Sequence, residues 1–180
     1  MKINQHWLTD ITRTPSPNFD DRPDPADISL LVIHCISLPP GEFDNHHIDR
    51  LFCNQLNPAD HPYFQEIHQL TVSAHLLIKR DGECVQYVPF DKRAWHAGKS
   101  TYEDREQCND FSIGIELEGT ESIDYTDRQY QQLATITRAL LETYPKLSTK
   151  RITGHSDIAP GRKTDPGASF DWQRLGELLK

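Results

Sequence analysis

One segment of the sequence concentrates side chains that could do chemistry. Residues 154–167 hold an imidazole (His155), two carboxylates (Asp157 and Asp165) and an ammonium group (Lys163). The Pro and Gly content of this segment predicts a loop rather than a helix or strand. Loops of this kind, fixed at both ends by regular elements, often carry functional sites. Judged by residue types alone, a solvated polar loop explains the segment equally well.

A metal site is one chemistry that the chain could build. Two histidines and one carboxylate, with a fourth position left to water, form a common catalytic zinc arrangement. His34, His155 and Asp165 could supply these ligands, but they are far apart in the sequence and match no short motif. The spacing leaves four alternative ligands open: His61, His75, His96 and Asp157.

Two other hydrolytic chemistries have less support. A Ser-His-Asp hydrolase is disfavoured because the chain has no G-x-S-x-G segment. A thiol hydrolase using Cys35 or Cys108 stays open, although no local pattern supports it.

The candidate residues lie at or near the ends of predicted strands, and these strands must position them. Residues 28–33 form a continuous apolar run, typical of a strand buried on both faces, and it ends directly in His34. Residues 111–118 alternate apolar and polar, which places Glu116 and Glu118 on one face with Gly114. The glycine leaves room there for another group. We expect the side chain of Glu118 to be solvated.

His155 follows a short strand-like run at 150–153. If this strand and the two above run parallel, His34, Glu116 and His155 meet along one edge of a sheet, where α/β folds place ligands. Alternation at 72–79 and a return at 84–88 predict a hairpin, with His75 on its polar face.

Amphipathic helices are expected on this sheet. Thr126 and Gln129 form a capping box for a helix that Pro145 ends, and a last helix is expected within 170–179. The predicted fold class is α/β, with a single central mixed sheet covered by helices. We expect one domain spanning 1–180. Within it, 1–27 is an irregular arm, and 37–70 and 90–110 are loops that flank the site.

Composition limits the classes of partner. The chain has 180 residues, a net charge of -8 and a pI near 5.5, which argues against nonspecific binding to nucleic acid or a membrane surface. It has no apolar run long enough for a membrane helix and no signal-peptide pattern, so we expect a cytoplasmic protein. Its four cysteines are expected to be reduced.

Several segments, in the same order along nearly the whole chain, resemble the zinc-dependent N-acetylmuramyl-L-alanine amidases, whose fold phage amidases and peptidoglycan recognition proteins share. Within that group the chain is similar to cytoplasmic amidases that act on anhydro-muropeptides. The one departure noted is Gly161, which precedes Arg162. The matching segments are 16–19, 31–34, 61–64, 72–75, 93–98, 108–119 and 154–167.

The resemblance implies an enzyme that binds Zn²⁺ through His34, His155 and Asp165. It implies that Glu116 handles the proton of the attacking water and that Lys163 stabilises the oxyanion. The implied substrate is the amide between anhydro-N-acetylmuramic acid and L-alanine, cleaved in cell-wall recycling. A monomer is expected. Candidate contacts to the substrate are Tyr63, His75, Trp95, Arg105 and Arg162.

Overall fold

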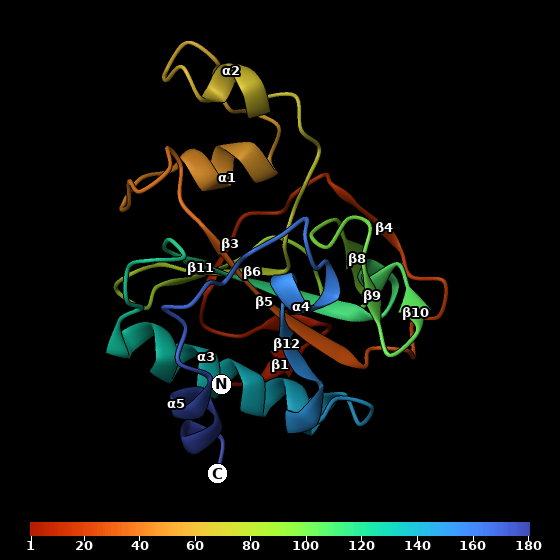
Figure 1. Cartoon of the computed structure of the whole chain (residues 1–180). Coiled ribbons are helices and arrows are strands. Elements are labelled where there is room, and N and C mark those ends of the chain that lie inside the picture. Colours follow the sequence, from red (N-terminus) through yellow and green to blue (C-terminus); the bar gives the residue numbers. More distant parts are fainter.

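The computed structural model describes residues 1–180 and is built around a six-stranded mixed sheet (Figure 1). Four adjacent strands run parallel. The last of them is also the first strand of the hairpin predicted from the sequence, whose second strand is antiparallel to it. The predicted mixed α/β architecture is therefore confirmed. In spatial order the strands are β12 (Ile152–Gly154), β5 (Leu30–Ile36), β11 (Ser112–Glu118), β6 (Leu76–Ile78), β7 (Cys84–Gln86) and β3 (Thr12–Arg13).

The N-terminal arm is more regular than its proline and aspartate content predicts. Four short strands lie within 1–27, and β3 pairs with β7 as the outermost strand of the main sheet. Prolines interrupt these strands, but backbone groups between them still find partners, such as the Thr14 N–H that donates to the Gln86 carbonyl. The two-stranded ribbons are β1 (Ile3–Asn4) with β2 (Trp7–Leu8), β4 (Phe19–Asp21) with β8 (Lys92–Ala94), and β9 (Thr101–Tyr102) with β10 (Arg105–Glu106).

The longest helix is α3 (Asp127–Thr143), and its start is fixed as predicted. The Thr126 hydroxyl accepts from the Gln129 N–H, and the Gln129 amide oxygen accepts from the Thr126 N–H. No helix combines the length and the hydropathy that a membrane crossing requires. The other helices are α1 (His47–Phe52), α2 (Phe64–Ile67), α4 (His155–Ile158), α5 (Trp172–Leu178) and two 3-10 turns at Cys108–Asp110 and Thr149–Arg151.

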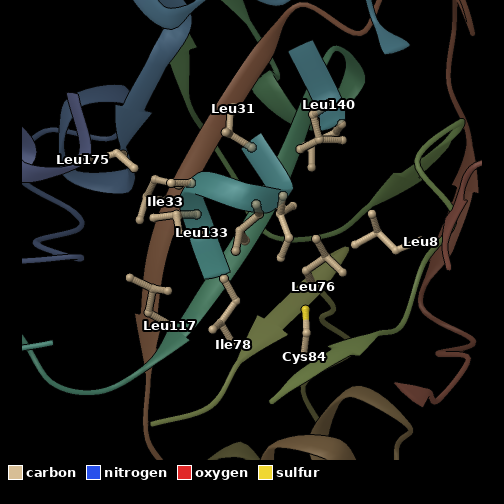
Figure 2. Close-up of a cluster of buried hydrophobic side chains, with 14 of the residues drawn as sticks. Leu8, Leu31, Ile33, Leu76, Ile78, Cys84, Leu117, Leu133, Leu140 and Leu175 are labelled. Atoms are coloured by element: carbon tan, nitrogen blue, oxygen red, sulfur yellow. The ribbon is translucent and has the colours of Figure 1, made fainter. Parts of the chain in front are cut away.

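The main hydrophobic core lies between the sheet and the helices α3 and α5. Leu31 and Ile33 of β5 and Leu117 of β11 face Leu133 and Leu140 of α3, as Figure 2 shows. Because side chains alternate along a strand, His34 and Glu116 must point to the opposite face. The chemically active residues are therefore separated from the main core by the sheet itself.

A second hydrophobic cluster anchors the segment 37–70, which stands away from α3 and α5 on the other side of the sheet (Figure 1). Ile48, Leu51 and Phe52 of α1 and Phe64 of α2 pack in one cluster with Tyr87. The Tyr87 hydroxyl also donates a hydrogen bond to the Asp49 carboxylate. The segment is therefore packed against the sheet, because the same cluster contains Leu77 of β6 and Val85 of β7.

Candidate active site

Three side chains converge at the carboxyl ends of β5 and β12. The Nδ1 atoms of His34 and His155 are 2.9 Å apart. The Oδ2 atom of Asp165 lies 3.1 Å from Nδ1 of His34 and 3.0 Å from Nδ1 of His155. Both imidazoles are buried, and the Asp165 side chain is 13% exposed. The structure thus brings together the three residues that the family resemblance singled out as ligands.

This donor set fits a divalent ion of the size of zinc. Tetrahedral zinc holds nitrogen and oxygen ligands at about 2.0–2.1 Å, which puts the ligands roughly 3.4 Å from one another. The three atoms of His34, His155 and Asp165 form a triangle slightly smaller than this. Small outward shifts of the side chains would admit the ion, and the cleft side of the triangle leaves room for a fourth ligand.

The local sequence explains how the ligands are aimed. Glycine at 154 ends β12, and His155 begins the one-turn helix α4, a short helix that the Pro and Gly content of 154–167 did not predict. The Asp165 carbonyl accepts a hydrogen bond from the Ser156 N–H, which ties the second half of the loop to its first turn. Residues ten positions apart are thereby held around one point.

Four alternative ligands lie outside the triangle. Asp157 accepts hydrogen bonds from the Gly154 N–H and the Thr153 hydroxyl, so it caps the start of α4. His61 accepts from the Tyr63 N–H. His75 is fully buried, and its Nδ1 accepts from the Gly114 N–H. His96 contacts His34, but at Nε2, on the side away from Asp165.

The electrostatics of the site follow from burial and from proximity. Burial lowers the pKa of His34 to about 4, so its imidazole is neutral at physiological pH. Burial acts to raise the pKa of Asp165, but hydrogen bonds with His155 and His34 hold that pKa well below its usual range. Neutral imidazoles and an ionised carboxylate are the forms in which these groups bind metals.

Glu116 and Lys163 lie in the cleft that exposes this cluster, a cavity of about 580 Å³. Burial, with the charge of Asp165 second, raises the pKa of Glu116 well above its ordinary value, and Lys163 opposes this shift. The Oε2 atom of Glu116 is buried without a hydrogen-bond partner. A carboxyl group with a raised pKa and a free oxygen is suited to accept and release a proton.

The expectation that Glu118 is solvated was wrong. Its side chain is 1% exposed and accepts hydrogen bonds from the backbone N–H groups of Asp44 and Arg80. The period of two placed it correctly on the face of Glu116, but long-range loops cover that end of β11. Glu118 therefore fastens loops, whereas Glu116 faces the cleft.

Two of the five candidate substrate contacts, Tyr63 and Trp95, line the cleft. The structure does not bring the other three to it. Arg105 lies over the Phe111 ring, 3.7 Å from its centre, and pairs with Asp27. Arg162 donates to the carbonyls of Ala97 and Lys99, and His75 is buried as described above.

Cys35 lines the cleft, but burial raises the pKa of its thiol to about 12. Cys108 is fully buried, and burial raises its pKa as well. Neither residue is a thiolate at neutral pH, so the thiol-hydrolase alternative has no support in the structure.

Sequence reasoning missed the apolar wall of the cleft. Leu38, Ile67, Leu70 and Val72 contribute to this wall, and Leu70 is 49% exposed. The segment 37–70 was expected to flank the site, but the residues within it that line the cleft were not identified. The cleft therefore combines the polar ligand residues with apolar side chains that come mainly from this segment.

Comparisons with known proteins identify the family of this chain. The family model described as N-acetylmuramoyl-L-alanine amidase matches residues 24–168. The 1,6-anhydro-N-acetylmuramyl-L-alanine amidase AmpD of Escherichia coli K12 is 62% identical over 179 residues, covering 99% of this chain and 97% of its own length.

Solved structures give the same picture. The crystal structure of a selenomethionine AmpD derivative superposes with a TM-score of 0.97 at 60% identity, over all of both chains. The amidase AmiD from E. coli, in complex with anhydro-N-acetylmuramic acid-L-Ala-D-γ-Glu-L-Lys, has a TM-score of 0.61 at 28% identity. That match covers 84% of this chain and 57% of AmiD. The chain therefore belongs to the N-acetylmuramoyl-L-alanine amidase family.

Proposed function

We propose that this protein is a zinc-dependent amidase that hydrolyses the amide between 1,6-anhydro-N-acetylmuramic acid and L-alanine in muropeptides. The observation that carries the proposal is the convergence of His34, His155 and Asp165 at the floor of a cleft that also holds Glu116 and Lys163. The substrate is inferred from the AmpD relatives, which match over nearly their full length, and from the ligand in the AmiD complex.

In this proposal His34, His155 and Asp165 hold the zinc ion. When bound, zinc lowers the pKa of a coordinated water and polarises a carbonyl group. His34 and His155 enter the site from the ends of buried strands, so their direction is fixed by the sheet. This rigidity holds the two imidazoles beside the Asp165 carboxylate.

Glu116 is proposed to take a proton from the attacking water and to pass it to the leaving amine of L-alanine. Its raised pKa suits both halves of this transfer, because a more basic carboxylate accepts a proton more readily and the resulting acid can release it. Lys163, which lines the same cleft, is proposed to stabilise the negative charge that develops on the amide oxygen.

The stem-peptide amide is proposed to lie along the polar side of the cleft, with the rest of the substrate against its apolar wall. Tyr63 and Trp95 present aromatic surface there. Every proposed site residue comes from one chain, so a monomer is sufficient for the reaction. We place this reaction in the cytoplasm, as a step in the recycling of cell-wall fragments.

The decisive experiment is mass spectrometry of the products from a defined anhydro-muropeptide, with zinc and with a chelator. We expect free anhydro-N-acetylmuramic acid and the intact stem peptide with zinc, and no cleavage after chelation. Substrate that remains uncut by zinc-loaded protein would overturn the proposal. Tight binding without products would instead identify a muropeptide-binding protein. Light scattering and cell fractionation test the proposed monomer and its compartment.

A further inference from the structure

In each of the two ligand imidazoles, the Nε2 atom points away from the ligand triangle. The two Nε2 atoms contact consecutive residues of the chain. Nε2 of His34 lies 2.9 Å from Nδ1 of His96, and Nε2 of His155 lies 3.1 Å from the carbonyl oxygen of Ala97. We call His96-Ala97 the brace. It belongs to the segment between β8 and β9, whereas the two ligands come from the ends of β5 and β12.

The backbone of the brace is itself held by hydrogen bonds to Asn109. The side-chain oxygen of Asn109 accepts from the backbone N–H groups of His96, at 3.2 Å, and Ala97, at 2.8 Å. Asn109 is 7% exposed, so water competes little for these bonds. On its far side the His96 ring reaches the Ser112 hydroxyl, at 3.1 Å from Nε2.

The absence of a side chain at Gly114 leaves space for the His96 ring. A Cβ atom at this position would lie 2.5 Å from Cγ of His96, closer than atoms can approach. The glycine that the sequence placed beside Glu116 thus makes room for a histidine ring behind the ligand cluster. The ring edge meets His34 at an interplanar angle of 84°.

These contacts suit the tautomer that zinc binding requires, with the proton on Nε2 of each ligand. The Ala97 carbonyl can only accept, so Nε2 of His155 must carry the hydrogen, and Nδ1 keeps its lone pair. The same assignment for His34 requires Nδ1 of His96 to accept. The hydrogen of His96 is then on Nε2, where the Ser112 hydroxyl receives it. Both Nδ1 lone pairs then point into the triangle with Asp165.

We propose that His96 and Asn109 are positioning residues, which set the tautomer and the direction of both zinc-binding imidazoles through the brace. The inference rests on the proposed function only in that the bound ion is zinc. Partners of the outer nitrogens of metal-binding histidines commonly change metal affinity by about 10- to 100-fold. One short segment serves both histidines here, so a single change should affect both.

Two variants test whether His96 acts through the hydrogen-bond acceptor that it offers to His34 or through the bulk of its ring. His96→Ala removes the acceptor, whereas His96→Asn keeps one, because the Asn side-chain oxygen is as many bonds from Cα as Nδ1 of histidine. Asn109→Ala releases the brace without touching either ligand. Asn18→Ala is the matched control. Asn18 is also a buried asparagine, 2% exposed, and it fastens loops by donating to the carbonyls of Phe52 and Val72, away from the ligands.

Zinc dissociation constants come from chelator competition, and the hydrogen bonds of the Nε2–H groups of His34 and His155 come from ¹H–¹⁵N NMR of the zinc-loaded protein. We expect His96→Ala and Asn109→Ala to weaken zinc binding by about 10- to 100-fold. His96→Ala should also expose the Nε2–H of His34 to exchange with water, and His96→Asn should recover most of the affinity. Asn18→Ala should lower the unfolding midpoint and leave the zinc dissociation constant unchanged.

Unchanged zinc affinity in His96→Ala, or weakening by the same factor in Asn18→Ala, would overturn the proposal. So would an Nε2–H of His34 in the zinc-loaded wild-type protein that exchanges with water as fast as it does in His96→Ala. A wild-type protein that binds zinc and leaves the muropeptide uncut would overturn the proposed function instead, and the zinc affinities of the variants would still decide the role of the brace.

Discussion

Glu116 and His34 are direct neighbours on adjacent parallel strands, paired in the register of β11 and β5. Side chains paired in this way point to the same face of a sheet, and a slip of one residue would turn one of them into the core. The proposed proton-transfer group and a proposed zinc ligand are therefore placed relative to each other by seven consecutive strand pairs, without help from a flexible loop.

Replacing Asp165 by Ala is expected to remove zinc and activity together, because two imidazoles alone leave the ion underligated. Zinc per chain, measured by atomic spectroscopy after dialysis, checks this. Asp157→Ala is the control in the same loop. It loses the hydrogen bonds that cap α4, so we expect about 1 kcal/mol of lost stability with zinc retained. If Asp157→Ala lost zinc and Asp165→Ala kept it, Asp157 would be the carboxylate ligand and the assignment of Asp165 would be wrong.

Replacing Glu116 by Gln keeps the shape of the side chain and removes its capacity to accept a proton. We expect one zinc per chain and a fall in kcat of about 10²- to 10⁴-fold. Glu118→Gln, on the same face of β11, should change stability and leave kcat within a few-fold, because Glu118 binds loop N–H groups. Equal kinetic effects of the two substitutions would contradict the assignment.

Replacing Lys163 by Met is expected to lower kcat by about 10²- to 10³-fold, because an oxyanion would lose its positive partner. KM should change little, since the charge develops only in the transition state. Steady-state kinetics on a defined anhydro-muropeptide separates the two constants. A rise in KM with normal kcat would instead assign Lys163 to substrate binding.

Two glycine substitutions should have opposite effects. Gly114→Ala places a Cβ atom against the His96 ring, and we expect a loss of about 1–3 kcal/mol in the free energy of unfolding. Gly176→Ala, in α5, meets no atom within 4 Å and should add about 0.5–1 kcal/mol. Urea unfolding of both variants beside the wild type checks the pair. Destabilisation by Gly176→Ala would mean that a Cβ atom at this position of α5 does meet a neighbouring group.

Acid should destabilise the zinc-free protein partly through His75. Burial, with Arg22 second, lowers the pKa of His75 from 6.5 to about 3. Its contribution to stability is fully present above pH 6.5 and is lost as pH falls toward 3, because the unfolded chain takes up the proton first. The slope from one such group approaches about 1.4 kcal/mol per pH unit.

His75→Asn keeps an acceptor for the Gly114 N–H and cannot titrate. The unfolding free energy of this variant should therefore depend less steeply on pH between 6.5 and 4.5, measured with urea in the presence of chelator. Slopes that coincide with the wild type would mean that His75 is protonated in the folded state.

Patterns within a single element carried most of what the sequence predicted. The apolar run ending at His34, the alternation around Glu116 and the capping box of Thr126 each depend on neighbours in the chain, and β5, β11 and α3 appear where these patterns place them. The family resemblance then singled out residues that the structure brings to one cleft.

What the sequence could not predict depends on distant partners. Glu118 is buried because Asp44 and Arg80 reach it from other loops. Arg105 is drawn from the cleft by Asp27 and the Phe111 ring. His96 was one of several possible ligands until the fold placed it behind His34. In each case, contacts between residues far apart in the sequence decided the outcome, and no local pattern encodes them.

The sheet order also determines when the site can first exist. β5 precedes its neighbour β12 and the ligands His155 and Asp165 by more than 100 residues. A growing polypeptide on the ribosome therefore exposes His34 long before its partners are made. A molecule truncated ahead of Asp165 would retain much of the sheet and lack the complete ligand triangle, so only chains extended past Asp165 can capture the ion here.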